Sequence, residues 1–273
     1  MREVISNLIS VVLRMSKTKI KVSAVSYLNT LPFLYGIKNS GLIEKIDFEQ
    51  DIPSVCASKL LNNEVDIALV PVAVIPLMNE SYIISDYCIG ASGKVKTVLL
   101  LSDVPLNQIE SISLDYQSRT SVNLIKILAE KFWNIRPEWK KTEKGYETKI
   151  KGRNAGLIIG DRTFHLKKNY KYVYDLAEEW EKFTKLPFVF AAWVSNKPID
   201  EEFTKEFNKA LCYGLENIEK VVSEFYLAFP GSRIDMNKYF TQYISYELDD
   251  KKREAMNLFF KELNEMQQVS SQA

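Results

Sequence analysis

Short apolar or alternating runs, separated by turn residues, recur along the first half of the chain. Residues 19–27 (KIKVSAVSY) alternate in polarity and are rich in β-branched residues, which predicts a strand, and residues 48–52 predict a second one. Residues 53–61 begin with proline and predict a helix. The run VDIALV at 65–70 is apolar almost throughout, as in a strand buried on both faces. This order predicts a βαβ unit.

The alternation of strands and helices continues through the middle of the chain. Apolar residues recur at helical spacing over 119–133, which predicts an amphipathic helix, and 177–184 predict another. From Asp200 onward the pattern is helical, with breaks at Pro230-Gly231 and near Asp249-Asp250. Strands are expected at residues 82–89, 95–101, 112–115, 156–159, 172–174 and 188–194.

These elements predict an α/β fold of two lobes. The helical C-terminal stretch has too few strands to form a lobe alone, so it must pack on a sheet formed earlier. We therefore expect lobe 1 to comprise residues 15–111 plus 199–273, and lobe 2, residues 112–198, to be inserted in it. Crossovers near Ser111 and Ser195 would form a hinge, and a ligand would lie in the cleft between the lobes.

Residues 1–14 are predicted to be an N-terminal extension. Their apolar run, 5–13, is too short to span a bilayer and is followed by basic residues rather than by a cleavage site. A weak signal peptide is the alternative.

The charge and cysteine content narrow the choice of partners. The chain has 36 Lys and Arg against 35 Asp and Glu, a net charge of +1, which points to neither nucleic acid nor a membrane surface. Three widely spaced cysteines indicate free thiols and a cytoplasmic protein rather than a disulfide framework. His165 is the single histidine, so a site with two or three histidine ligands to a metal is excluded.

Three polar clusters follow predicted strands, where ligands gather in open α/β sheets. In the first, Ser26 and Asn29 can donate hydrogen bonds to a carboxylate or hydroxyl. The alternative is a turn and N-cap before a helix that begins at Pro32. In another cluster, which follows the strand predicted at 156–159, Gly160 lets a ligand approach the backbone and Asp161 can accept or donate a proton. The alternative is that these two residues only form a turn.

The second cluster, between residues 115 and 121, predicts an anion site. The first N–H groups of the following helix lack internal partners and carry the positive end of its dipole. Ser118, Thr120 and Ser121 add hydroxyl donors, and Arg119 can hold a carboxylate with two hydrogen bonds. The alternative is that Ser118 only caps the helix and that Arg119 is solvated.

Five motifs occur together and in order: VSYLNTLPF (25–33), DIALVP (66–71), LDYQSRTSVNL (114–124), LIIGD (157–161) and the segment 174–193 ending in LPFVFAAW. From residue 19 to the C-terminal helices the chain resembles the chorismate dehydratases of the futalosine route to menaquinone. The resemblance implies a type II periplasmic-binding-protein fold. It also implies conversion of chorismate to 3-[(1-carboxyvinyl)oxy]benzoate and water, with no metal and no organic cofactor.

The resemblance also assigns roles. Asn29 matches the residue expected at the reacting centre, and Thr97 stands where the family has Ser in a G-x-V-x-S-V segment. Ser26, Asn29 and Thr97 would then hold one side of chorismate, and residues 118–121 would hold a carboxylate. The proton acceptor would be Asp161 or a carboxylate of the substrate.

Two alternatives remain open: a non-catalytic solute-binding protein for a small carboxylate, and the sister 1,4-dihydroxy-6-naphthoate synthase, whose first strand ends in a different motif. The sequence leaves open whether the chain is a monomer or a homodimer.

Overall fold

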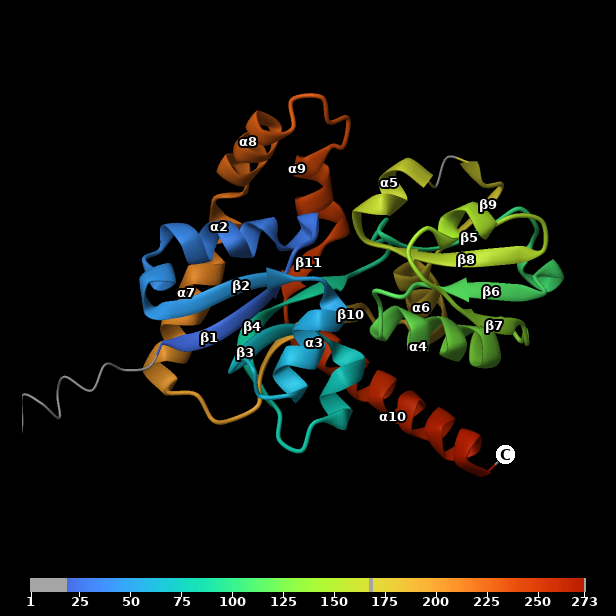
Figure 1. Ribbon diagram of the computed structural model, residues 1–273, viewed down its shortest axis with the longest axis horizontal. Helices are drawn as coiled ribbons and strands as arrows, with labels where there is room; N and C mark the ends of the chain where they lie inside the picture. Colours follow the sequence, from blue (N-terminus) through green and yellow to red (C-terminus); the bar gives the residue numbers. More distant parts are fainter. Residues whose placement is uncertain (1–18, 167–168, 273) are drawn as a thin grey trace, which may run out of the picture.

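The chain forms two lobes, each built on its own β-sheet, which lie side by side in Figure 1. The computed structural model describes residues 19–166 and 169–272. The predicted N-terminal extension, residues 1–14, lies outside the described residues. Within the described part of the chain, no helix combines the length and the apolar character needed to cross a membrane.

The first lobe contains a six-stranded sheet in the order β11-β4-β10-β3-β1-β2. Strand β1 runs parallel to both of its neighbours, because helix α3 returns the chain from β2 to β3. The predicted βαβ unit is thereby confirmed. Strand β10 runs antiparallel to β3 and β4, and β11 runs antiparallel to β4. The elements are β1 (Ile20–Val25), β2 (Ile46–Asp51), α3 (Pro53–Leu61), β3 (Ile67–Pro71), β4 (Tyr82–Ala91), β10 (Phe188–Ser195) and β11 (Ser245–Glu247).

The first and last parts of the chain meet in this lobe. Helix α2 (Leu31–Asn39) crosses α7 (Glu201–Glu216) so closely that a Cβ added at Gly36 would lie 2.0 Å from the carbonyl oxygen of Ala210. A Cβ at Gly214 would lie 1.8 Å from the carbonyl oxygen of Pro32. Glycine at both positions therefore lets the two backbones touch. Helices α8 (Ile218–Ala228), α9 (Met236–Lys238) and α10 (Asp250–Gln272) follow.

The second lobe contains a five-stranded sheet in the order β7-β6-β8-β5-β9. Strand β6 runs parallel to β7 and β8, whereas β5 runs antiparallel to β8 and β9. The predicted helix over 119–133 begins as α4 and ends in a π-helical turn, residues 128–132. The elements are β5 (Val98–Ser102), β6 (Ser111–Leu114), α4 (Thr120–Ile127), β7 (Glu138–Lys141), β8 (Asn154–Ile159), α5 (Thr163–Leu166), β9 (Tyr172–Asp175) and α6 (Leu176–Thr184).

The observed sheets divide the chain at different places from the predicted lobe boundaries. Strand β5 pairs within the second sheet, although the prediction of 15–111 for lobe 1 included it. Strand β10 pairs with β3 and β4 of the first sheet, although the prediction of 112–198 for lobe 2 included it. The chain therefore crosses between lobes over residues 92–97 and 185–187 rather than near Ser111 and Ser195. Both strands are buried along their whole length, so their apolar pattern does not specify which sheet they join.

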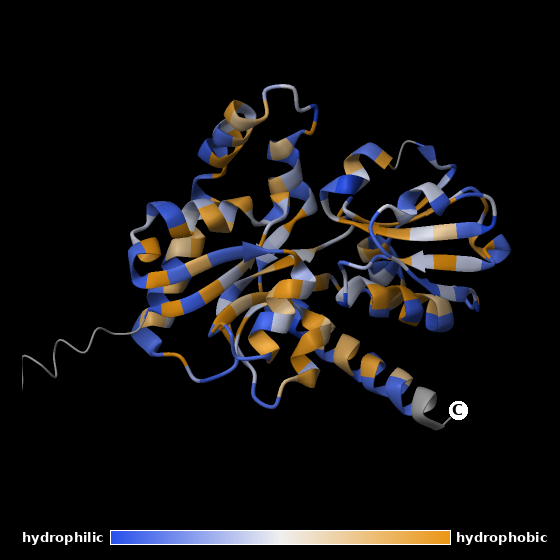
Figure 2. Cartoon of the chain, viewed as in Figure 1, coloured by the Kyte–Doolittle hydropathy of each residue, from blue (hydrophilic) through white to orange (hydrophobic). Residues whose placement is uncertain are grey.

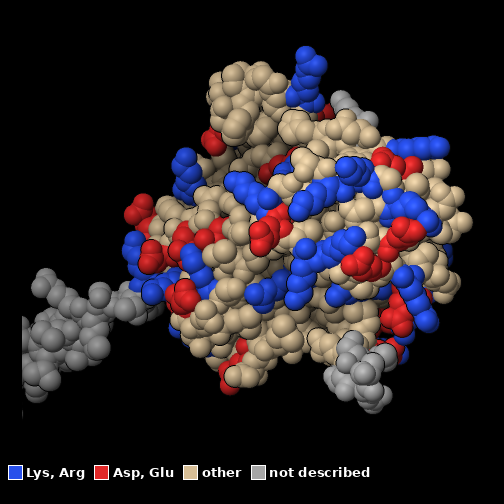
Figure 3. All heavy atoms as spheres, turned by 45° about the vertical axis from the view of Figure 1, so that its right-hand side comes forward, with Lys and Arg blue, Asp and Glu red and all other residues tan. Residues whose placement is uncertain are grey.

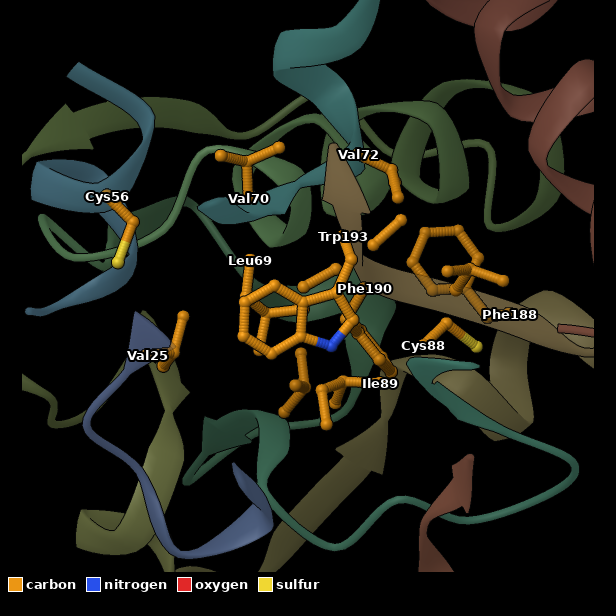
Figure 4. Packing of buried hydrophobic residues seen from close by; sticks show 14 of the residues in the cluster. Val25, Cys56, Leu69, Val70, Val72, Cys88, Ile89, Phe188, Phe190 and Trp193 are labelled. Carbon is orange, nitrogen blue, oxygen red and sulfur yellow. The ribbon is translucent and has the colours of Figure 1, made fainter. Parts of the chain in front are cut away.

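Trp193 of β10 lies at the centre of the first lobe's core. Figure 4 shows its indole among side chains from β1, β3 and β4. Its ring also meets Phe33 of α2 at 6.0 Å and Phe207 of α7 at 5.0 Å, so both helices are anchored to the sheet through it. In Figure 2 the helices carry alternating hydrophobic and hydrophilic segments, as expected of helices with one face on a sheet.

Helix α10 runs from the first lobe along the junction toward the second (Figure 1). Its Phe259 meets Phe188 of β10 at 5.2 Å and Trp180 of α6 at 6.1 Å, so it packs against both sides of the crossover at 185–187. The face of the molecule in Figure 3 shows Lys and Arg interspersed with Asp and Glu, in keeping with the near-neutral net charge.

Candidate active site

The carboxyl ends of strands from both sheets face each other across the junction of the lobes. On the first lobe, β1 ends at Val25 and the chain turns through Leu28–Thr30 into α2. On the second lobe, β6 leads into the loop before α4, and β8 ends at Ile159 just before Gly160. This is the position at which open α/β sheets hold their ligands.

A small cavity of about 60 Å³, here called the inner cavity, is enclosed between these strand ends. Residues from both lobes line it, and apolar side chains such as Val25, Ile89 and Phe190 form much of its wall. Six of the residues predicted from the sequence also line it: Asn29, Thr97, Ser118, Thr120, Ser121 and Gly160. Ligand cavities usually measure about 300–1,000 Å³, so the lobes are closed more tightly here than a substrate would allow.

Ser118 and Thr120 are engaged with the protein itself. The Oγ of Ser118 accepts a hydrogen bond from the backbone N–H of Ser121 at 3.0 Å, so it satisfies one of the free N–H groups of α4. This is the capping arrangement that the sequence left as the alternative. The buried Oγ1 of Thr120 donates to the carbonyl oxygen of Phe190 at 3.1 Å and accepts from the N–H of Ala73 at 3.3 Å. Thr120 therefore joins the two lobes.

Two of the predicted binding residues lie outside the inner cavity. Ser26 is exposed, and its backbone N–H donates to the carbonyl oxygen of Asp51. Arg119 is half-buried and turns toward the first lobe, where its Nη2 donates to the Oγ of Ser58 at 3.3 Å. In this arrangement Arg119 bridges the lobes at the edge of the cleft. Its predicted grip on a carboxylate would require the guanidinium to leave Ser58.

Asp161 follows Gly160 of the inner cavity but lies on the wall of a larger cavity. Its carboxylate oxygens accept from the backbone N–H of Leu28 at 3.3 and 3.4 Å, which links the second lobe to the first. Burial raises the pKa of Asp161 from 3.8 to about 6, and the hydrogen bond from Leu28 opposes that rise. A carboxyl group with this pKa changes its protonation state close to neutral pH, as a general acid or base requires.

Gly160 is placed where only glycine fits well. Its φ is +69°, and a Cβ there would lie 3.0 Å from the ring of Tyr27. The Tyr27 hydroxyl donates to Oε1 of Gln117 at 2.7 Å, so its side chain crosses the cleft from one lobe to the other. Burial raises the pKa of Tyr27, which keeps the hydroxyl protonated as a donor.

Gln117 is held by an ionic network in which Asp115 is buried and Arg162 is partly exposed. Nη2 of Arg162 donates to Gln117 Oε1 at 3.0 Å and to Asp115 Oδ2 at 2.5 Å. Asp115 also accepts from the N–H groups of Gln117 and Ile159, so it ties together the ends of β6 and β8. The second lobe therefore presents a rigid polar edge to the cleft.

Two tyrosines of the C-terminal segment complete the site. The hydroxyl of the buried Tyr239 lies 3.2 Å from Oγ1 of Thr97, and the Tyr246 hydroxyl donates to the backbone oxygen of Asn29 at 2.9 Å. Sequence reasoning missed both, because their segment carries only a helical pattern. It also missed Tyr27 and Gln117, although both lie inside the motifs already noted. The available signal was that each stands next to a predicted binding residue, Ser26 or Ser118.

A second cavity of about 1020 Å³, here called the outer cavity, is lined in part by Leu28, Asp161 and Tyr239, the last of which contacts Thr97 of the inner cavity. The lone histidine, His165, is exposed on its wall. Over the described residues, no three His, Cys, Asp or Glu side chains gather closely enough to hold a metal ion.

The family model described as menaquinone biosynthesis matches residues 20–265. The chain is 24% identical over 251 residues to a chorismate dehydratase of Campylobacter jejuni, covering 87% of this chain and 94% of that protein. It is 26% identical over 193 residues to a chorismate dehydratase of Thermus thermophilus, covering 62% of this chain and 69% of that one.

Solved structures with this fold are more distant in sequence. A protein from Archaeoglobus fulgidus matches with a TM-score of 0.68 at 16% identity, covering 94% of this chain and all of that one. The periplasmic aliphatic sulphonate binding protein of Escherichia coli matches at 0.59 and 13% identity, covering 93% and 88%. A Candida albicans protein with the generic periplasmic binding protein fold matches at 0.54 and 14% identity, covering 90% and 94%. The expected periplasmic-binding-protein fold is thus confirmed.

Proposed function

The chain belongs to the menaquinone biosynthesis family, and we propose that it dehydrates chorismate to 3-[(1-carboxyvinyl)oxy]benzoate. The observation that carries the proposal is the inner cavity, in which Asn29 and Thr97 face the Ser118–Ser121 loop of the other lobe. Uncharged hydroxyl and amide groups of this kind can orient a substrate that carries two carboxylates and a hydroxyl. The free thiols of Cys56, Cys88 and Cys212 support a cytoplasmic location.

The reaction needs orientation more than a strong catalyst. Loss of a proton and the neighbouring hydroxyl as water makes the ring aromatic, so the dehydration is thermodynamically favourable. Holding both groups in the correct orientation lowers its barrier. An amide is not a base at neutral pH, so Asn29 would position the leaving hydroxyl or the proton acceptor. Thr97, whose hydroxyl lies against that of Tyr239, would hold the substrate from the same side.

Two groups are candidates for the proton acceptor. Asp161 has a pKa of about 6, so near pH 7 most of it is ionised and able to accept a proton. A carboxylate of chorismate itself is the other candidate. In the closed arrangement Asp161 faces Leu28 rather than the inner cavity, so its participation would require the lobes to part and the bond to Leu28 to break.

The direct test is to incubate the purified protein with chorismate and to follow the products by mass spectrometry. The proposal expects a product lighter than chorismate by one water, with the ultraviolet absorption of an aromatic ring. Binding of chorismate with no turnover would instead indicate a solute-binding protein and would sink the proposal.

Asn29→Ala tests the reacting centre. Because Asn29 lines the inner cavity without belonging to the core, the variant should fold normally while kcat falls by about 100-fold or more, the usual loss for a group that acts in the transition state. Asn39→Ala, which changes an exposed asparagine of α2, is the matched control and should retain full activity. Near-normal turnover of Asn29→Ala would remove Asn29 from the mechanism.

Arg119→Ala tests the carboxylate grip. Loss of a charge-assisted hydrogen bond should raise KM by about ten- to a hundredfold and leave kcat less affected. The control is Arg136→Ala, which removes an exposed arginine of the same lobe. An unchanged KM would show that Arg119 serves only to bond Ser58.

A further inference from the structure

The outer cavity has the size of a ligand site in its own right. Its volume of about 1020 Å³ lies at the upper end of the range for small-molecule sites. One wall comes from the first lobe, through the end of α8, α9 and the turns around them, and the other from the second lobe, through Asp161 and α5. Tyr239, which touches Thr97 with its hydroxyl, stands between this cavity and the inner one.

Aromatic rings line much of this cavity. Phe164 of the second lobe meets Tyr239 of the first edge to face at 5.2 Å. Phe225, Phe229 and Tyr243 add three more rings, and Phe229 is 57% exposed. Such a wall can hold a flat ring by stacking or edge-to-face contacts.

Two lysines bring positive charge to the same wall. The ammonium of Lys96 lies 5.4 Å from the centroid of the Tyr243 ring, and that of Lys238 lies 5.8 Å from it. Within the described part of the chain, neither forms an ion pair with an acid. The cavity also holds Arg233, against the two acids Asp161 and Asp235. The charged residues of the lining are thus three cations and two acids, so the cavity wall carries a net positive charge that favours an anion.

Lys96 is held in place by a strained backbone. Its φ is +66°, a left-handed conformation that is unfavourable for a residue with a side chain. The N–H of Lys96 donates to Oδ2 of Asp175 at 2.7 Å, and its carbonyl accepts from Oγ1 of Thr163 at 3.2 Å. The fold thus fixes the direction in which this side chain leaves the crossover between the lobes.

We propose that the outer cavity is a second ligand site, which binds an aromatic carboxylate with its ring against the aromatic wall and its carboxylate near the lysines that contact Tyr243, Lys96 and Lys238. The inference goes beyond the proposed reaction, because it holds whether or not chorismate is dehydrated. It predicts a preference for planar aromatic carboxylates over saturated rings of the same charge.

The test is isothermal titration calorimetry with benzene-1,3-dicarboxylate, compared with cyclohexane-1,3-dicarboxylate. We expect the aromatic acid to bind the intact protein more tightly than the saturated one. Lys96→Gln and Lys238→Gln should each weaken its binding about tenfold, and the double variant should abolish it. Lys209→Gln, an exposed lysine of α7, is the matched control and should bind as the parent does. Thermal melts of every variant by circular dichroism verify folding.

Three results would overturn the inference: no binding to the intact protein, equal affinity for both acids, or unchanged affinity in the folded double variant. Asn29→Ala separates the two cavities, since binding at the outer one should survive this change. If Asn29→Ala abolishes binding, the acid occupies the inner cavity and the inference is wrong. Chorismate turnover, measured on the same samples, decides the proposed reaction separately.

Discussion

Replacing Asp161 by asparagine should make the protein more stable at neutral pH. The carboxyl group is partly buried at the lobe junction, and its pKa rises from 3.8 to about 6 because burial disfavours the charged form. The folded state therefore holds this proton more tightly than the unfolded state. The stability that the protonated group provides is complete below pH 3.8 and is lost as the pH rises through about 6.

The magnitude follows from that pKa difference. Each tenfold change in acidity corresponds to about 1.4 kcal/mol, so the full effect approaches about 3 kcal/mol. Water reaches part of Asp161, so we expect about 1–3 kcal/mol. Asparagine carries no charge at any pH, and its side-chain oxygen can still accept from the N–H of Leu28.

The assay is urea unfolding of the parent and of Asp161→Asn at intervals from pH 4 to pH 8. The two free energies of unfolding should differ little near pH 4, and the variant should gain progressively up to about pH 7. Asp47→Asn, which replaces an exposed aspartate of β2, is the matched control. Parallel curves for the parent and Asp161→Asn across the whole range would refute the claim that burial destabilises the Asp161 carboxylate. Turnover by the same variant would reveal whether Asp161 or the substrate accepts the proton.

Two further changes test the junction between the lobes. Gly160→Ala places a Cβ against the Tyr27 ring at a φ of +69°, so it should lower the free energy of unfolding, measured by urea titration, by about 1–3 kcal/mol. Gly231→Ala is the control: open space surrounds this glycine, so the free energy of unfolding should change little. Thr120→Val leaves the N–H of Ala73 and the carbonyl of Phe190 without their partner, so it should loosen the closed lobes by about 1–3 kcal/mol. Small-angle X-ray scattering should then show a larger radius of gyration than in Thr120→Ser; equal radii would mean that Thr120 does not control closure.

The local elements were predictable because their patterns are strong. Helix α3 begins at Pro53 and ends at Leu61, as the proline and the following apolar run predict. The motifs after β1, before α4 and after β8 meet at one cleft, because the carboxyl ends of β1 in the first sheet and of β6 and β8 in the second face each other across the junction. Edge strands β7 and β11 were missed, since they are short and carry little apolar pattern.

The pairing of distant segments was beyond the reach of these patterns. A strand buried on both faces, such as β5 or β10, looks the same whichever sheet it joins. The bond between Tyr246 and Asn29 joins positions 217 residues apart, and no local signal marks Tyr246 as the partner of Asn29. For Ser118 and Thr120, the sequence identified hydroxyl groups but could not say whether a ligand or the protein itself would bind them.

The contacts that close the cleft set the energy needed to open it. Thr120 with Phe190, Tyr27 with Gln117, and Asp161 with Leu28 each join the lobes through a hydrogen bond. At about 1 kcal/mol net for each bond, they oppose opening by only a few kcal/mol. A ligand bound at micromolar affinity releases about 8 kcal/mol, which is enough to favour whichever degree of opening fits it. Phe259 of α10 packs against Trp180 and Phe188, which lie on either side of the crossover at 185–187. We therefore expect each lobe to move as a rigid body, with the two crossovers, residues 92–97 and 185–187, as the hinge.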